Sequence, residues 1–358
     1  MKEKSNLPPS LIAHTPWEAQ SNPIWPATTF TLHRNLSHYN FPPKLGSPQL
    51  QQTLSALSEN LLKSSSLQNP IFLQAESLSA NDKEFLYEHF LCPEGFQNTL
   101  AGQGFVIDAR SHFLALINID DHLQMRLIES QGKWEEAFNA LNQMEIALGS
   151  HLDFAFSPRF GYLTSDPRLC GTGLVIQAYL HLPALIHTAQ LPETLQKQKE
   201  ESISSSGMGG SLNDLFGDLL VLHNSYTLGL TEENILNDIR STALKLSALE
   251  KTLRAHLKEE NNLDMKDQIS RAFGLMVHSY QLQTKEALDA LSLIKLGLDL
   301  GWIEGITDSS LNTLFFKCRR AHLGEIVGEH LSDPHDIARK RAEFMHEFLP
   351  SIHLKIDH

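Results

Sequence analysis

The sequence predicts an α+β protein in which a mixed body, residues 1–245, is followed by a helical domain, residues 246–358. Three observations predict this organisation. The length of 358 residues suits one large and one smaller domain. Short apolar runs bounded by turn residues recur up to about residue 225, which is typical of strands. From Thr231 onward, apolar residues recur at helical spacing.

The first part of the body is expected to be irregular and then to alternate helix and strand. Residues 1–50 contain eight prolines and many Ser, Asn and Thr, which favours an extended segment with little regular structure. Residues 50–63 carry leucines at helical spacing. Residues 103–118 contain two strand-like runs, GFVID and FLALIN, joined by the turn-like ARSH.

A helix, loops and one more strand complete the predicted body. Residues 133–150 are expected to form a helix that ends at Gly149. Its apolar face should consist of Trp134, Phe138, Leu141 and Ile146. Residues 154–185 suit loops that lead into a strand or a short helix, and residues 202–211 (SISSSGMGGS) are flexible by composition. Residues 218–225 (DLLVLHNS) have strand character.

The helical domain begins with a recognisable start signal. Thr231 is followed by two glutamates, which suits a helix N-cap and the helix dipole. Three later segments repeat the helical pattern: DMKDQISRAFGLMVHSYQL, TKEALDALSLIKLGLDLGWI and DIARKRAEFMHEFLP.

Composition excludes several classes of function. The chain has a net charge of −13 and a pI near 5.7, so it should repel nucleic acid. Its three cysteines are far apart, which indicates neither disulfides nor a cysteine zinc site and fits a reducing compartment. The apolar runs are too short for a signal peptide or a membrane span. We therefore expect a cytoplasmic protein without membrane or nucleic-acid partners.

The residues alone offer few chemical motifs. The GMGGS segment at 207–211 lacks the third glycine and the lysine of phosphate-binding loops, so a surface loop is favoured. The eighteen histidines show no metal-ligand spacing, and no G-x-S-x-G motif occurs. NIDDH, residues 118–122, ends a strand with two carboxylates and a histidine. Composition alone favours a solvated strand end over a catalytic rim there.

Four segments, however, resemble the phosphagen (guanidino) kinase family in its bacterial protein-arginine kinase branch (McsB). LALINIDDHLQMRL is similar to the family signature N-E-E-D-H-L-R. GYLTSDPRLCGTGLVIQAYLHLPAL resembles G-Y-L-T-x-C-P-T-N-x-G-T-G-L-R-A-S-V-x-L-H-L-P-A-L. FGDLLVLHNSYTLGLTEENIL matches L-G-N-x-x-x-I-S-N-x-x-T-L-G-x-S-E-E-x-I, and TFTLHRNLSHYNFP falls where the family has S-S-R-I-R-L-A-R-N-L-x-x-x-P-F-P. AHLGEIVGEHL and RKRAEFMHEFL match the bacterial helical extension.

The resemblance implies a guanidino-kinase-like antiparallel sheet flanked by helices, which holds Mg-ATP and a guanidinium group. In this family the γ-phosphoryl group moves to an arginine side chain, here of a protein, while five arginines bind the phosphates and glutamates orient the guanidinium. Catalysis then rests on positioning and charge neutralisation. The helical domain would mediate dimerisation and bind phosphoarginine. The partners implied are a second copy of the chain, a small zinc-binding activator protein and a Clp-type unfoldase.

The chain departs from the family at its chemically important positions. The family's arginines are replaced by Thr29, Thr31, Gln124, Val175 and Ser206. Ser211 replaces a glutamate, Ile119 and Asp120 replace the signature glutamates (Asp120 the catalytic one), and Asp166 replaces a cysteine. His89 matches a histidine that contacts the nucleotide in the family.

These departures predict a pseudokinase that acts as a scaffold or adaptor in protein quality control, with no cofactor. A charge-assisted hydrogen bond contributes roughly 1.5–3 kcal/mol, and a tenfold change in affinity corresponds to about 1.4 kcal/mol. The loss of five arginines should therefore lower the affinity for a triphosphate by several powers of ten. Losing one transition-state arginine alone costs about 10³–10⁵ in rate. The alternative is an active, Mg-ATP-dependent kinase whose phosphate-binding arginines are relocated to Arg34, Arg126 or Arg168. A second alternative is a phosphoarginine-binding module that uses Asp336, Arg339 and Arg341.

Overall fold

A computed structural model describes residues 5–17, 20–92, 98–198, 200–328, 333–348 and 352–356. Within these residues, one eight-stranded antiparallel sheet has the order β2-β3-β4-β5-β1-β8-β10-β9. Its strands are β1 (Ala27–Arg34), β2 (Ile71–Gln74), β3 (Gly104–Ile107), β4 (Phe113–Ile117), β5 (Leu123–Glu129), β8 (Leu174–His181), β9 (Ile203–Ser206) and β10 (Leu219–Asn224). Two further two-stranded antiparallel sheets pair β6 (Phe156–Ser157) with β7 (Gly161–Tyr162), and β11 (Ile303–Glu304) with β12 (His353–Leu354).

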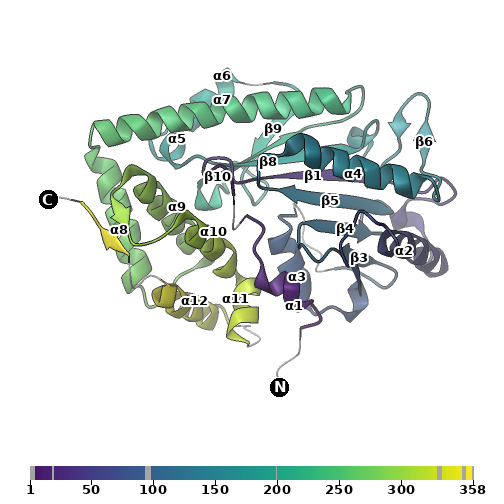
Figure 1. Cartoon of the computed structure of the whole chain (residues 1–358), viewed down its shortest axis with the longest axis horizontal. Coiled ribbons are helices and arrows are strands. Elements are labelled where there is room, and N and C mark those ends of the chain that lie inside the picture. The colour runs from purple at the N-terminus through teal and green to yellow at the C-terminus, as the bar shows by residue number, and fades with distance from the viewer. Residues whose placement is uncertain are drawn as a thin grey trace.

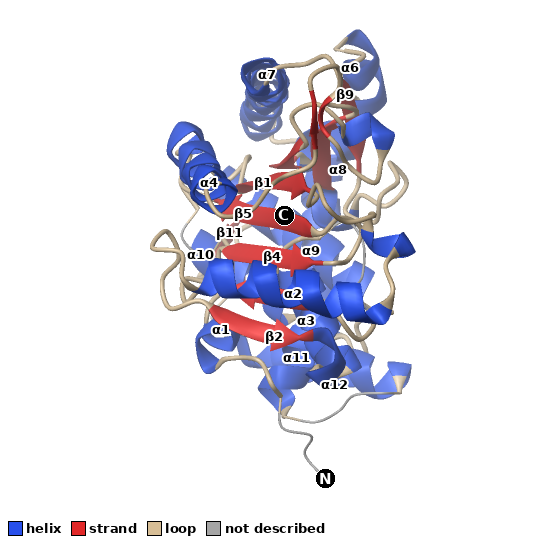
Figure 2. Ribbon diagram, turned by 90° about the vertical axis from the view of Figure 1, so that its right-hand side faces the viewer, coloured by secondary structure: helices blue, strands red, loops and turns tan. Residues whose placement is uncertain are grey.

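Helices cover both faces of the sheet (Figures 1 and 2). One face packs against α2 (Ser47–Leu62), α4 (Trp134–Gly149), α5 (Pro183–His187) and α7 (Glu232–Glu259). The opposite face packs against α3 (Ala80–His89) and the C-terminal helices. The C-terminal helices are α8 (Leu263–His278), α9 (Thr284–Leu300), α10 (Asp308–Lys317), α11 (Arg320–Val327) and α12 (Pro334–Phe348). Two short helices, α1 (Pro9–Ala13) and α6 (Leu191–Lys197), complete the set.

The α+β organisation predicted from the sequence is confirmed. The two runs in residues 103–118 form β3 and β4, residues 218–225 supply β10, and Thr231 caps α7 by accepting a hydrogen bond from the Asn234 backbone N–H. The predicted boundary after residue 245 lies inside α7, which continues without interruption from Glu232 to Glu259. This helix therefore belongs physically to both parts.

The first fifty residues differ most from expectation, because they contain the central strand β1. Every residue of this strand except the half-buried His33 is buried, including Thr28, Thr29 and Thr31. Threonine is β-branched and suits a strand, but the surrounding prolines obscured this signal.

Two smaller expectations also need correction. Ile146 is 57% exposed rather than part of the apolar face of α4, because the neighbouring Glu145 turns inward to meet Arg34. Helix α4 includes Gly149 and is capped by Ser150. Residues 203–206, expected to be flexible, form the edge strand β9 paired with β10.

The N-terminal segment packs between the sheet and the C-terminal helices. The Trp17 ring lies 6.2 Å from Tyr179 on β8 and 4.8 Å from Phe316 on α10, measured between ring centroids. Leu7 and Leu11 are buried in the same core. No helix in the described part of the chain has the length and apolarity needed to cross a membrane.

Candidate functional site

The strand register brings most of the positions predicted from the family onto one face of the sheet. Thr31 on β1 lies opposite Arg126 on β5 and Val175 on β8, and Thr29 lies opposite Gln177. Because side chains alternate along a strand, Gln124 points to the same face as Arg126. Ser206 on β9 pairs with Val221 on β10, and Val221 pairs with Tyr179 on β8, so Ser206 lies on the same face as Tyr179. Five positions spread over 178 residues of sequence thus share one surface, the face that packs toward the C-terminal helices.

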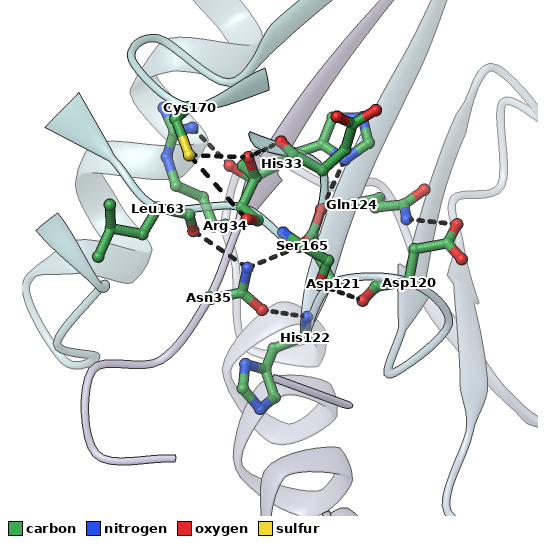
Figure 3. Close-up of polar contacts among 12 residues, drawn as sticks. His33, Arg34, Asn35, Asp120, Asp121, His122, Gln124, Leu163, Ser165 and Cys170 are labelled. Carbon is green, nitrogen blue, oxygen red and sulfur yellow. Dashed lines mark hydrogen bonds and ion pairs between the residues drawn. The ribbon is translucent and has the colours of Figure 1, made fainter. Parts of the chain in front are cut away.

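The loop between β4 and β5 forms a rim at the end of this surface (Figure 3). Asp121 is buried and accepts hydrogen bonds from the Asn35 side chain (2.6 Å) and the Ser165 backbone N–H (2.7 Å), and its other oxygen lies 2.9 Å from Nδ1 of His33. Burial alone would raise the pKa of this carboxyl, but these hydrogen bonds outweigh it and lower the pKa. Asp121 therefore binds other parts of the fold and is buried away from solvent.

Two further residues of the rim are structural as well. Asn118 has a left-handed backbone (φ 59°), and its side chain bonds the carbonyls of Leu50 and Gly102 and the hydroxyl of Thr53. His122 is fully buried, and its Nδ1 accepts the backbone N–H of Leu36. Burial lowers the pKa of His122 to about 4, so its ring is neutral at pH 7.

Asp120 differs from its neighbours because it is exposed. Its carboxylate accepts one hydrogen bond, from Gln124 at 3.3 Å, while its backbone carbonyl accepts the Ser165 hydroxyl at 2.7 Å. Asp166 lies on the adjacent loop, where the Arg168 guanidinium contacts both of its oxygens at 2.7–3.1 Å. The hydrogen bonds from Arg168 lower the pKa of Asp166. Of the two carboxylates predicted here, only Asp120 is available to an incoming group.

One of the three candidate relocated arginines reaches the sheet face. Arg34 is buried against Glu145 (2.7 Å) and the Tyr162 ring (3.5 Å to its centroid), and Arg168 projects into solvent beside Asp166. Arg126 is buried at the centre of the face. Its acceptors are Thr31 Oγ1 at 3.3 Å, Thr29 Oγ1 at 3.0 Å, the Leu91 carbonyl at 2.7 Å, Gln177 Oε1 at 2.5 Å and the Tyr179 hydroxyl at 3.5 Å. All of these acceptors are neutral.

A small cavity of about 50 Å³ is separated from Arg126 by Leu91, Gln177 and Tyr179, which contact both. It is bordered by Leu91, Gln177, Tyr179, Ser206, Met208 and Arg319, among others. A single water needs about 10–15 Å³ on this measure, so the enclosed part of the cavity holds a few waters. No group of three His, Cys, Asp or Glu side chains in the described ranges could hold a metal ion.

The remaining predicted nucleotide positions do not converge on this cavity. His89 is fully buried, its Nε2 lies 3.1 Å from the Ser111 carbonyl, and its ring stacks in a cluster with Phe85 and His322. Burial lowers the pKa of His89 well below its usual value. Ser211 is exposed in the turn after β9, where its carbonyl accepts the Gly207 N–H. Neither His89 nor Ser211 is among the residues that line the cavity.

The proposed phosphoarginine residues on α12 are also engaged within the chain. Arg341 is buried and donates to the carbonyls of Cys318 and Leu282, both at 2.6 Å. Arg339 pairs with Glu343 and lies 3.5 Å from Asp336. Both arginines are thus engaged in contacts within the chain, Arg341 in the core and Arg339 at the helix surface.

Comparison with known proteins agrees with the fold. The chain superposes on a taurocyamine kinase from Schistosoma mansoni with a TM-score of 0.57 and 24% identity, covering 68% of this chain and 35% of that one. A lombricine kinase gives a TM-score of 0.56 at 18% identity, covering 71% and 73% of the two chains. The fold is thus that of the guanidino kinases.

Sequence similarity then gives the family. Residues 51–253 match the ATP:guanido phosphotransferase C-terminal catalytic domain, and residues 262–356 match the protein-arginine kinase McsB C-terminal domain. The chain is 41% identical to a protein-arginine kinase of Chlamydia pneumoniae over 85% of both chains, and 33% identical to one of Syntrophomonas wolfei over 89% of both. The chain belongs to the ATP:guanido phosphotransferase family, in its protein-arginine kinase branch.

Sequence reasoning missed three residues that define the cavity. Gln177 and Tyr179 lie on the same face of β8 as Val175. Polar residues at every second position of an apolar run could have indicated this face from the sequence. Arg319 reaches the cavity from the start of α11, and no local pattern indicates this long-range contact.

Proposed function

We propose that this chain is a protein-arginine kinase homologue that does not transfer phosphate and acts through protein contacts, as a scaffold or adaptor. The observation that carries the proposal is the sheet face itself. Five family arginine positions hold Thr29, Thr31, Gln124, Val175 and Ser206, and Arg126 is already bonded to protein acceptors. A triphosphate would meet the buried guanidinium of Arg126 and that of Arg319 beside it, where the family pattern supplies five arginines.

The electrostatic deficit is large compared with what hydrogen bonds from neutral groups can restore. Threonine and glutamine can donate hydrogen bonds worth roughly 0.5–1.5 kcal/mol, against roughly 1.5–3 kcal/mol for charged donors. They also leave the phosphate charge uncompensated in a partly buried site. Nucleotide affinity and rate should both fall by several powers of ten.

Titration of the full chain with Mg-ATP in a calorimeter tests the proposal most directly. We expect no saturable heat at nucleotide concentrations up to a millimolar. A double variant that moves the arginine back along β5, Gln124→Arg with Arg126→Gln, provides a matched comparison at constant charge. A micromolar dissociation constant for the unaltered chain would contradict the proposal.

One observation favours a second candidate function, an active protein-arginine kinase. Arg126 lies opposite Thr31 and bonds Thr29, the two positions where family arginines are replaced, so it could serve as a relocated phosphate-binding group. Incubation with Mg-ATP and a basic protein would then yield phosphoarginine, detected by phosphorus NMR. That signal should disappear in Asp120→Ala and in Arg126→Gln, and remain in Arg168→Gln.

The adaptor proposal includes partners that follow from the family. We propose a cytoplasmic homodimer that contacts a small zinc-binding activator protein and a Clp-type unfoldase in protein quality control. Light scattering of the purified chain tests the dimer. Co-purification with the two partner classes, compared with and without residues 262–356, tests the adaptor role.

A further inference from the structure

The charge of Arg126 is the feature of this face that the proposed function leaves unexplained. The side chain is 4% exposed, and no carboxylate in the described part of the chain lies within ion-pair distance of it. Burying a charge without a counter-charge is costly, and a fold usually retains one when a partner completes it. Arg126 Nε is in addition a buried donor without an acceptor, while four acceptors lie around one terminal nitrogen.

The nearest groups that could become negative remain protonated. Burial raises the pKa of the Cys92 thiol to about 11, although Arg126 opposes this. Burial likewise raises the pKa of the Tyr179 hydroxyl above its usual value. Neither side chain supplies the missing negative charge at neutral pH.

The guanidinium of Arg319 borders the cavity, whereas Arg126 lies behind the lining residues Leu91, Gln177 and Tyr179. Arg319 donates to the Glu88 carbonyl at 3.0 Å, and its Nε lies 4.0 Å from the Glu88 carboxylate. Glu88 also lies 2.9 Å from His322, whose pKa is lowered by burial, so the histidine is neutral at pH 7. Arg126, Arg319 and Glu88 together carry a net charge of +1, and Arg319 is the charged one among the lining residues described.

We propose that this cavity binds a small organic monoanion, a carboxylate with a short apolar body. One negative charge balances the net charge of Arg126, Arg319 and Glu88, which a triphosphate would exceed. The walls suit such a molecule, since Gln177, Tyr179 and Ser206 offer hydrogen bonds and Leu91, Met208 and Val221 offer apolar contact. Leu91, Gln177 and Tyr179 touch both the cavity and Arg126, so a ligand that displaces the Gln177 oxygen reaches the guanidinium.

This inference rests on the proposed function, because it assigns the altered face a ligand other than nucleotide. The test uses the full chain with sodium propionate as the probe, at constant ionic strength, and propionamide as its uncharged equivalent. We expect propionate to raise the thermal midpoint by a few degrees in a saturable way, and propionamide to have no effect. Arg126→Gln should weaken propionate binding at least tenfold, and Arg271→Gln, at an exposed arginine elsewhere, should leave it unchanged.

A substitution that supplies the missing charge keeps the proposal testable even if Arg126→Gln does not fold. Gln177→Glu places a carboxylate where Gln177 Oε1 now lies, 2.5 Å from the guanidinium, without changing the side-chain size. We expect this variant to melt at a higher temperature than the unaltered chain and to lose its response to propionate. A lower melting temperature with the propionate response intact would overturn the inference.

The two proposals fail in different ways. Micromolar binding of Mg-ATP would contradict the proposed function. Absence of binding by both Mg-ATP and propionate would leave the proposed function standing and overturn only the carboxylate site.

Discussion

Two buried arginines on adjacent strands, Arg34 and Arg126, have opposite electrostatic surroundings. Arg34 at the end of β1 meets the Glu145 carboxylate at 2.7 Å, two carbonyls and the face of Tyr162. Arg126 in the middle of β5 meets neutral acceptors. The first arginine completes the fold, whereas the second has charge left over for a partner outside the chain.

The same contrast separates the rim of the site from its sheet face. At the rim, Asn118, Asp121 and His122 match the family signature, and each is bonded to backbone or side chains from distant segments. On the sheet face, the positions that depart from the family include Gln124 and Val175, whose replacements disturb no such network. The rim positions that match the family pattern thus carry hydrogen bonds to distant segments, whereas Gln124 and Val175 on the sheet face do not. A preserved signature loop is therefore weak evidence for catalysis.

The largest expected effect comes from breaking the paired arginine. Glu145→Ala should lower the free energy of unfolding by about 3–5 kcal/mol, because it leaves the Arg34 charge buried without its partner. Urea denaturation measures the change. The control is Glu135→Ala, at another glutamate of α4, which forms an exposed ion pair with Arg240 on α7. This variant should lower the free energy of unfolding by less than about 1 kcal/mol. Equal costs for the two variants would mean that the Arg34 pair is not structural.

The next effect is a loss of stability in acid that depends on His122. Its pKa is about 4 in the folded chain against 6.5 normally, so the unfolded chain takes up this proton first as the pH falls. Stability should decrease between about pH 6.5 and pH 4, by roughly 3 kcal/mol once both states are protonated. The measurement is the pH dependence of urea unfolding in the unaltered chain and in His122→Asn. The variant should lack this part of the slope, and identical slopes would contradict the assignment.

Sequence alone gave the architecture wherever a periodic pattern was strong. The leucine spacing of residues 50–63 and the apolar runs of 103–118 predicted α2, β3 and β4 because such patterns are local. The strand β1 was not predicted from its own pattern, because its buried threonines lie among prolines and its neighbours β5 and β8 are distant in sequence. Its burial depends on those partners.

The site shows the same limit more sharply. The family pattern placed Thr29, Thr31, Gln124 and Val175 together, and Arg126 was a candidate replacement arginine. That Arg126 has no counter-charge among the described residues could not be predicted, since its acceptors come from Leu91 after α3, from β1 and from β8. Likewise, nothing local distinguishes buried Arg341 from Arg339, two residues away on α12. Charge compensation is a property of three-dimensional packing.

A smaller effect should follow from removing the charge of Asp121. The Asp121 carboxylate has three hydrogen-bond partners, and Asp121→Asn replaces it with an uncharged amide. We therefore expect a loss of about 2 kcal/mol in the free energy of unfolding at pH 7. Because the folded pKa is lowered, this stabilisation is present above the unfolded value near 3.9 and disappears as the pH falls through the folded pKa. The difference between the two proteins should therefore narrow below pH 4. A difference that stays constant to pH 2 would show that charge is not involved.

The smallest effect is expected at Asp120, the one exposed carboxylate of the rim. Its 3.3 Å contact with Gln124 is weak, so Asp120→Asn should change the free energy of unfolding by less than about 0.5 kcal/mol. Asp120→Asn and Asp121→Asn are the same chemical change at neighbouring positions. A larger loss of stability in Asp121→Asn is therefore due to the burial and hydrogen bonds of Asp121.

Asp120→Asn also distinguishes the two candidate functions. If the chain forms phosphoarginine and Asp120→Asn abolishes it without changing stability, Asp120 is retained for chemistry and the contrast between rim and sheet face fails. If neither protein forms phosphoarginine, Asp120 is an exposed residue of the β4–β5 loop without a catalytic role, as the proposed function expects.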